Sequence, residues 1–132
     1  HVWQGRFFSS ALDEAYLWAA VRYVERNPVR ARIVRKAENY PWSSASGHCE
    51  LRQDPLLTKK PFWRKQFEAI DDWPAWLDEG DEPEKLNVLR RNADKGLPCG
   101  AEKFILKLEK LTGRTLQYRP RGRPRKKEDK KG

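Results

Sequence analysis

Prolines are the feature that most limits what this chain can fold into. Nine of the 132 residues are proline, and six of these lie between residues 28 and 83. A proline inside a helix removes a backbone hydrogen bond and clashes with the preceding turn, so the helix ends or kinks there. We therefore expect residues 50–83 to form short pieces, broken at Pro55, Pro61, Pro74 and Pro83.

The clearest helix precedes the first of these prolines. Asp13 is a suitable N-cap, and Glu14 in the first turn suits the helix dipole. Up to Arg26, apolar residues recur at helical spacing, namely Leu17, Ala20, Val21 and Val24. Asn27 and Pro28 then suit the start of a second short helix, which is expected to bury Val29, Ile33 and Val34.

Two further helices are predicted near the other end of the chain. Residues 83–96 form one that ends at Gly96, and residues 100–113 form another that ends at Gly113. The second has one apolar face, made of Phe104, Ile105, Leu108 and Leu111. Residues 1–10 suit a short strand, and residues 38–49 a loop leading into a short helix capped by Ser43 or Ser44.

Tryptophan and phenylalanine are expected to hold the short pieces to the body of the protein. The residues expected to do so are Trp63, Phe67, Trp73 and Trp76, and Trp42 is also taken as a core residue.

Positive charge is concentrated at one end of the chain. The net charge is +9, yet residues 114–132 hold nine basic and two acidic residues, against 19 and 17 in the other 113 residues. Since little beyond Leu116 can pack, we expect residues 117–132 to be disordered until they bind. Such a polycation suits nucleic acid, an anionic membrane or an acidic protein.

Several classes of protein are disfavoured by composition. No apolar run approaches the roughly 18 residues that a membrane-spanning helix needs. Cys49 and Cys99 lack the spacing of a zinc site, and the only histidines are His1 and His48. We expect two reduced thiols in a cytoplasmic protein. The chain has no methionine and begins at His1, so we interpret it as a piece of a longer protein.

The stretch "RYVERNPVRARIV", residues 22–34, carries the pattern with the most chemistry. Tyr23 and Asn27 are four residues apart, so their side chains meet on one face if the last turn stays helical. A tyrosine hydroxyl attacks a phosphodiester well when a metal and nearby cations stabilise its phenolate. Asn27 would complete a metal site, and Arg22, Arg26 and Arg30 would hold phosphates.

A plainer interpretation fits the same spacing. Tyr16, Ala19, Ala20 and Tyr23 form a helix face that simply packs on the domain, and Asn27 is only a cap. Spacing alone favours this interpretation, because tyrosines on helices are usually core or boundary residues.

The order of several motifs resembles a known family. "HVWQGRF", "RYVERNPVRARIV", "YPWSSASGH", "GLPCGAEKF" and "GRPRK" together resemble the C-terminal two-thirds of REP-associated tyrosine transposases, single-tyrosine relatives of the HUH transposases. The resemblance implies that Tyr23 is the nucleophile, forming a 5′-phosphotyrosine bond with single-stranded DNA, and that Asn27 contributes to a Mg²⁺ or Mn²⁺ site. It implies short palindromic hairpins as substrate, in a nucleoid-associated protein.

The chain departs from that family at one essential point. The His-hydrophobic-His pair that names the superfamily is absent, and we expect it upstream of residue 1 with the rest of a ferredoxin-like sheet. We therefore predict that this chain alone does not cleave DNA. In "GLPCGAEKF", Leu97 and Ala101 stand where Arg and Ser are expected, which weakens a helix cap.

The tail carries a second, independent signal. Arg121, Gly122, Arg123 and Pro124 resemble the core of an AT-hook. Prolines would keep the backbone extended and Gly122 would let it lie in the minor groove, so the two arginines reach an A·T tract. The flanking residues Arg119, Arg125, Lys126 and Lys127 would contact phosphates.

The sequence thus predicts a mainly α chain, the C-terminal part of an α+β fold. We expect part of a catalytic domain at 1–49, a helical extension at 50–116 and a DNA-binding tail at 117–132. The alternative function is a non-catalytic DNA-binding module that presents its tail. A structural protein that binds an acidic partner is a weaker third possibility, since it gives no role to the glycine and prolines of the tail.

Overall fold

The computed structural model describes residues 9–57, 65–66, 68–120 and 122. These residues form helices joined by turns and contain no sheet; Leu12 and Cys99 pair in one isolated bridge. The mainly helical class is thus confirmed. The predicted strand at 1–10 lies largely outside the described residues, and the ferredoxin-like sheet stays an expectation.

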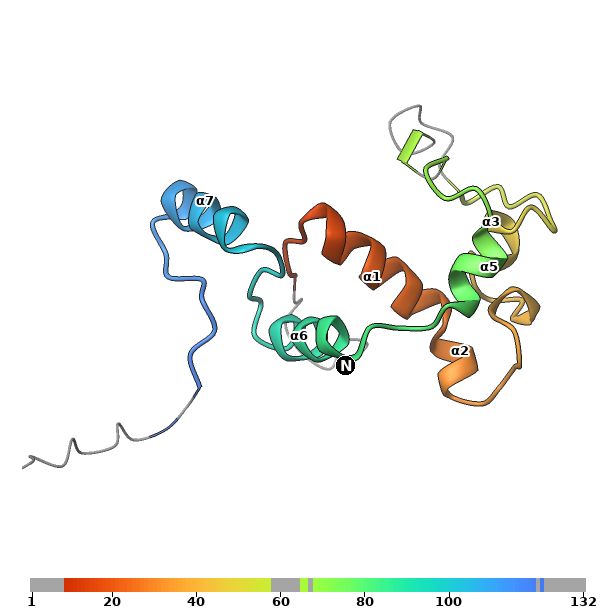
Figure 1. Cartoon of the computed structure of the whole chain (residues 1–132), viewed down its shortest axis with the longest axis horizontal. Helices are drawn as coiled ribbons and strands as arrows, with labels where there is room; N and C mark the ends of the chain where they lie inside the picture. Colours follow the sequence, from red (N-terminus) through yellow and green to blue (C-terminus); the bar gives the residue numbers. More distant parts are fainter. Residues whose placement is uncertain (1–8, 58–64, 67, 121, 123–132) are drawn as a thin grey trace, which may run out of the picture.

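Helix α1, Glu14–Glu25, runs through the middle of the molecule (Figure 1). Asp13 caps it as predicted, because its carboxylate accepts a hydrogen bond of 2.9 Å from the backbone N–H of Tyr16. The other oxygen of Asp13 accepts from the N–H of Ala101 at 2.8 Å. One carboxylate therefore joins the start of α1 to the residue that precedes helix α7 (Glu102–Thr112).

The second helix, α2, is a single turn, Asn27–Arg30, with Pro28 in its first turn and buried. This helix was expected to bury Ile33, but Ile33 is 63% exposed, so that prediction was wrong. Arg32 takes a left-handed conformation (φ 58°) just after the helix. The chain turns there, so the helical spacing that was expected to bury Ile33 does not extend that far.

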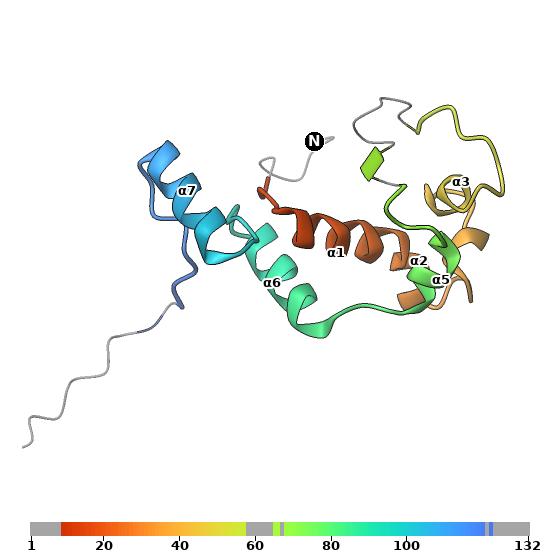
Figure 2. The same ribbon diagram turned by 45° about the horizontal axis from the view of Figure 1, so that its top comes forward.

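Three short elements gather at the C-terminal end of α1 (Figures 1 and 2). They are η1 (Ala37–Asn39), α3 (Ala45–His48) and α5 (Trp73–Asp78). Their buried residues form the α5 cluster, which Trp18 and Trp76 flank and which consists of Ala37, Ala45, Trp73 and Leu77. This cluster takes residues from both sides of residue 50, where a domain boundary was expected.

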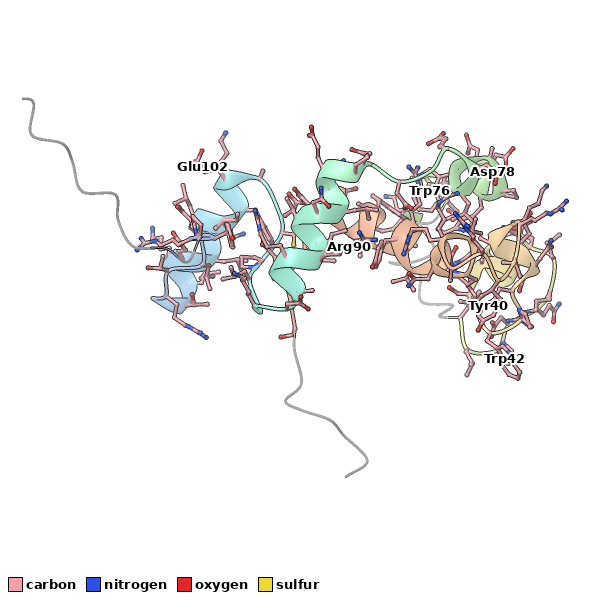
Figure 3. All side chains as sticks on the ribbon, turned by 90° about the horizontal axis from the view of Figure 1, so that it is seen from below. Tyr40, Trp42, Trp76, Asp78, Arg90 and Glu102 are labelled. Atoms are coloured by element: carbon pink, nitrogen blue, oxygen red, sulfur yellow. The ribbon has the colours of Figure 1, made fainter. Side chains whose placement is uncertain are left out.

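The predictions about the aromatic residues of this region were only partly confirmed. Trp73 and Trp76 hold α5 against α1, as predicted, with Trp18 edge-on to both rings. Trp42 is 85% exposed and projects from a turn (Figure 3), so its assignment to the core was wrong. The turn at Pro41 and Trp42 precedes α3 and carries the ring away from the cluster. Trp63 and Phe67 lie outside the described residues.

Helix α6, Pro83–Ala93, lies beside α1 (Figures 1 and 2). The contact forms the α6 cluster, Leu86, Leu89 and Cys99, with Tyr16 and Tyr23 of α1 packed against it. Gly96 follows α6 in a left-handed conformation (φ +63°), as a glycine after a helix often does.

Helix α7, Glu102–Thr112, ends at left-handed Gly113 as predicted. None of its residues is buried, and Leu111 of the predicted apolar face is 72% exposed. The helix stands away from the α5 end of the molecule (Figure 2). Among all the residues that the structure describes, no helix is long and apolar enough to cross a membrane.

Candidate active site and nucleic-acid interface

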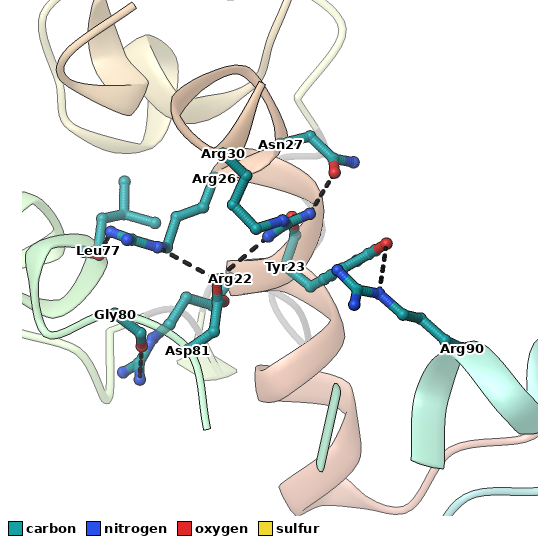
Figure 4. A network of polar contacts seen from close by, with 9 residues as sticks. All are labelled: Arg22, Tyr23, Arg26, Asn27, Arg30, Leu77, Gly80, Asp81 and Arg90. Atoms are coloured by element: carbon teal, nitrogen blue, oxygen red, sulfur yellow. Dashed lines mark hydrogen bonds and ion pairs between the residues drawn. The ribbon is translucent and has the colours of Figure 1, made fainter. Parts of the chain in front are cut away.

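Tyr23 lies in the last turns of α1, on the side that faces α6 (Figure 4). Its ring packs partly against the α6 cluster. Its hydroxyl accepts a long hydrogen bond, 3.4 Å, from Nε of Arg90 on α6, and this contact is exposed to solvent. Tyr23 is therefore a boundary residue: its ring packs against the α6 cluster and its hydroxyl contact is exposed, and whether it acts as a nucleophile stays a prediction.

Two guanidinium groups flank this tyrosine. The guanidinium carbon of Arg30 lies 3.9 Å from the centre of the Tyr23 ring, and that of Arg90 lies 5.3 Å from it. Cations at such distances are attracted to the negative face of the ring. Arg90 was missed in the sequence because 67 residues separate it from Tyr23 and no local pattern links them.

Tyr16 is the other tyrosine of α1 that packs against the α6 cluster. Burial raises the pKa of its hydroxyl, and the nearby Cys99 and Asp13 raise it further. Its phenolate is therefore harder to form than that of a free tyrosine. This environment argues against Tyr16 as a nucleophile.

Asn27 is linked to the backbone of Tyr23 through Arg30, while the predicted meeting of the two side chains stays a prediction. Oδ1 of Asn27 accepts a hydrogen bond from a terminal nitrogen of Arg30, and the same nitrogen donates to the backbone carbonyl of Tyr23 at 3.1 Å. Arg30 thus joins the two predicted site residues (Figure 4). Figure 4 also shows that the hydroxyl of Tyr23 is directed toward Arg90.

The described residues do not complete a metal site around Asn27. Within residues 9–57, 65–66, 68–120 and 122, no group of three or more His, Cys, Asp or Glu side chains could hold a metal ion. The Asn27 oxygen also faces a cation, Arg30. Asn27 can thus supply one ligand at most here, and the Mg²⁺ or Mn²⁺ site remains an expectation.

Arg22 is bound to the loop that follows α5. Its guanidinium donates to the carbonyl of Gly80 at 2.8 Å and to Glu79 at 3.0 Å. It also lies 4.4 Å from the centre of the Trp76 ring, and its side chain is only 12% exposed. A phosphate would therefore have to displace Glu79 to reach it.

Arg26 and Arg30 share one acidic partner, Asp81. Arg26 Nε lies 3.4 Å and Arg30 Nη1 3.1 Å from the same carboxylate oxygen, and Arg26 also donates to the carbonyl of Leu77. These three side chains are the Asp81 network (Figure 4). The predicted phosphate-binding row thus lies against acidic groups of its own chain, and whether it binds DNA stays a prediction.

A buried polar cluster was not foreseen in the sequence. Glu25 is 1% exposed, and its carboxylate accepts from Ser44 Oγ at 2.5 Å and from Trp73 Nε1 at 2.8 Å, and lies 2.6 Å from His48 Nδ1. We call these four residues the Glu25 cluster. Ser44 therefore binds Glu25, whereas Ser43 accepts from the N–H of Ala45 at the start of α3.

The tail begins at a fixed point on the body. The guanidinium carbon of Arg91 lies 3.9 Å from the centre of the Tyr118 ring, and Lys95 Nζ lies 4.6 Å from it. Arg119 and Gly122 are exposed. The other predicted tail residues lie outside the described residues, namely Arg121, Arg123, Pro124, Arg125, Lys126 and Lys127.

Comparison with known proteins found no matching family model, no curated relative and no similar solved structure. The resemblance to tyrosine transposases therefore rests on the motifs in the sequence.

Proposed function

We propose that this chain is the tyrosine-bearing part of a DNA strand transferase, which cleaves and rejoins single-stranded DNA at short hairpins. The observation that carries the proposal is the surface hydroxyl of Tyr23 in contact with the guanidinium of Arg90, with the guanidinium of Arg30 over the Tyr23 ring. Cations in this position favour a bound phosphate. We also propose that the protein works in the cytoplasm, bound to the nucleoid.

The reaction needs no co-reactant. The oxygen of Tyr23 attacks phosphorus, a P–O bond to tyrosine forms, and the P–O3′ bond breaks. The phenol loses its proton and the departing strand gains one at its 3′ oxygen. The product is a 5′-phosphotyrosine, and attack by another 3′-hydroxyl reverses the step and rejoins DNA. Arg90 holds the phosphate beside the Tyr23 hydroxyl.

A labelled DNA hairpin tests this proposal. The protein encoded by the complete reading frame, incubated with the hairpin and Mg²⁺, should give a covalent adduct that survives a denaturing gel. Tyr23→Phe should abolish the adduct and leave binding unchanged, because it removes only the hydroxyl. Arg90→Gln should slow adduct formation, whereas Arg114→Gln, an exposed arginine in the turn after α7, should not.

Two results would refute the proposal. One is an adduct that persists in Tyr23→Phe, and the other is no adduct from the complete protein under any divalent metal. The 132-residue chain alone should bind the hairpin without forming an adduct.

The second candidate, a non-catalytic DNA-binding module, is favoured by Tyr118. Arg91 and Lys95 hold its ring against α6, so the tail leaves the body at a defined place. A chain that ends at Pro120 keeps this contact and loses the remaining tail. If the tail engages about five phosphates, the full chain should show a log–log salt slope of about −4 to −5. An unchanged slope in the shortened chain would exclude the tail as the anchor.

A further inference from the structure

A pocket of about 510 Å³ lies between α1 and α6, directly beside the Tyr23 hydroxyl. The ring of Tyr23 forms part of its wall, and its apolar lining comes from both helices and the segment before α1: Leu12, Ala20, Val24, Leu89 and Ala93. Val24 is 60% exposed. Pockets of this volume and apolar character are typical of small-molecule sites.

Two charged side chains line the pocket, Arg90 of α6 and Asp94, which is four residues further along the chain. Arg90 contacts the Tyr23 hydroxyl, whereas Asp94 follows the last residue of α6. The lining thus offers a cation at the proposed reacting atom and a carboxylate one helical turn further along the chain.

A nucleotide carries groups that suit both charged residues and the apolar lining. Its phosphate is an anion that suits Arg90, and its base is a flat group that stacks on aromatic and apolar side chains. A carboxylate such as Asp94 accepts a hydrogen bond from an exocyclic amino group, as from cytosine N4. Thymine has no such amino group, so Asp94 disfavours it.

We infer that this pocket binds an unpaired DNA base that carries an exocyclic amino group, next to the phosphate attacked by Tyr23. The inference rests on the proposed function, because it names the nucleotide that the same site takes. An unpaired base is required, since a base inside a duplex is stacked and cannot enter a pocket. Arg90 holds the phosphate, the Tyr23 ring contacts the base, and Asp94 selects its amino group.

Binding of short DNA to the 132-residue chain tests the inference without any cleavage. Fluorescence anisotropy would compare octamers of deoxycytidine, of thymidine and of abasic nucleotides at one salt concentration. The octamer of deoxycytidine should bind about tenfold more tightly than the abasic octamer, which is a typical effect of stacking one base. The affinity for the thymidine octamer should lie between those for the other two octamers.

Two variants assign this difference to the pocket. Ala93 is exposed and lines the pocket, so Ala93→Trp should fill it and bring deoxycytidine down to the abasic level. Asp94→Asn should remove the preference for deoxycytidine over thymidine, because an amide both donates and accepts. The control is Ala15→Trp, since Ala15 is exposed on α1 and does not line the pocket.

The inference is overturned if the wild-type chain binds abasic DNA as tightly as deoxycytidine, or if Ala93→Trp retains the difference. It is also overturned if Ala93→Trp weakens binding of all three octamers equally, since the pocket would then serve the fold. A Tyr23-dependent adduct without base preference would support the proposed function and refute the base pocket. Base preference that Ala93→Trp removes, without any adduct from the complete protein, would support the base pocket and refute the proposed function.

Discussion

The two clusters along α1 are built on opposite principles. At its C-terminal end, the α5 cluster surrounds the carboxylate of Glu25, which contacts Ser44, His48 and Trp73. Against α6, the cluster is apolar, and the neighbouring pocket is open to solvent beside Tyr23.

The difference gives the α5 end of the molecule a rigid geometry and leaves the α6 side accessible to ligands. Hydrogen bonds to a buried carboxylate are directional, so they fix how the three short elements meet α1. Apolar contacts have no such direction, and they leave room at the surface near the proposed nucleophile. We interpret the α5 end as the scaffold that holds the arginines in place and the α6 side as the part that meets a ligand.

The largest effect is expected at Glu25. Glu25→Ala removes the carboxylate that accepts from Trp73 Nε1 and from the half-buried Ser44 Oγ, which should lower the free energy of unfolding by about 3–5 kcal/mol. Urea denaturation would measure the loss. Glu14→Ala, at an exposed position of the same helix, should cost at most about 1 kcal/mol. Equal losses in the two variants would show that the buried carboxylate of Glu25 contributes no more to stability than an exposed one.

Two leucines compare the clusters directly. Leu77 is 1% exposed in the α5 cluster, and Leu89 is 8% exposed beside the pocket. Leu77→Ala should cost about 3–4 kcal/mol, and Leu89→Ala about 2–3 kcal/mol, because the open side can relax. Urea midpoints at a constant m-value would rank the two, with exposed Leu111→Ala as the control. The reverse order would contradict the proposed difference in rigidity.

Asp81 tests whether the scaffold restrains the arginines. Asp81→Asn removes the carboxylate shared by Arg26 and Arg30 and should cost about 1–3 kcal/mol of stability. If these arginines bind phosphate, affinity for single-stranded DNA should rise severalfold, measured by anisotropy. Asp78→Asn makes the same charge change at an exposed position of α5 and serves as the control. A rise of the same size in both variants would assign the effect to net charge alone.

The smallest effect concerns a thiol beside the α5 cluster. Burial raises the pKa of Cys49 from 9.0 to about 11, and the nearby Glu38 and Glu25 add to the shift. Because the unfolded thiol ionises first, the folded state should lose stability as pH rises from about 9 to 11. Urea midpoints at these pH values should fall less steeply in Cys49→Ser. If the urea midpoint fell with pH equally steeply in Cys49→Ser, the loss of stability would not come from the Cys49 thiol.

The sequence predicted the longer helices well and their contacts poorly. Asp13 and Gly113 cap helices through local geometry, and local geometry is visible in a short stretch of sequence, although α6 ends at Ala93, before the predicted Gly96. The pairing of Tyr23 with Arg90 and the role of Glu25 depend on segments far apart in the chain. No periodicity encodes such pairs. Trp42 was misassigned because hydrophobicity alone does not reveal which way a turn carries its side chain.

The Glu25 carboxylate also has a consequence for how the chain folds. Helices α3 and α5 have four and six residues, lengths at which an isolated helix does not persist in water. Their helical conformation thus depends on contacts with Glu25 of α1, which are made by Ser44, His48 and Trp73. The amide hydrogens of α1's last turns, α3 and α5 should therefore exchange with solvent as one cooperative unit, while those of α7 exchange independently.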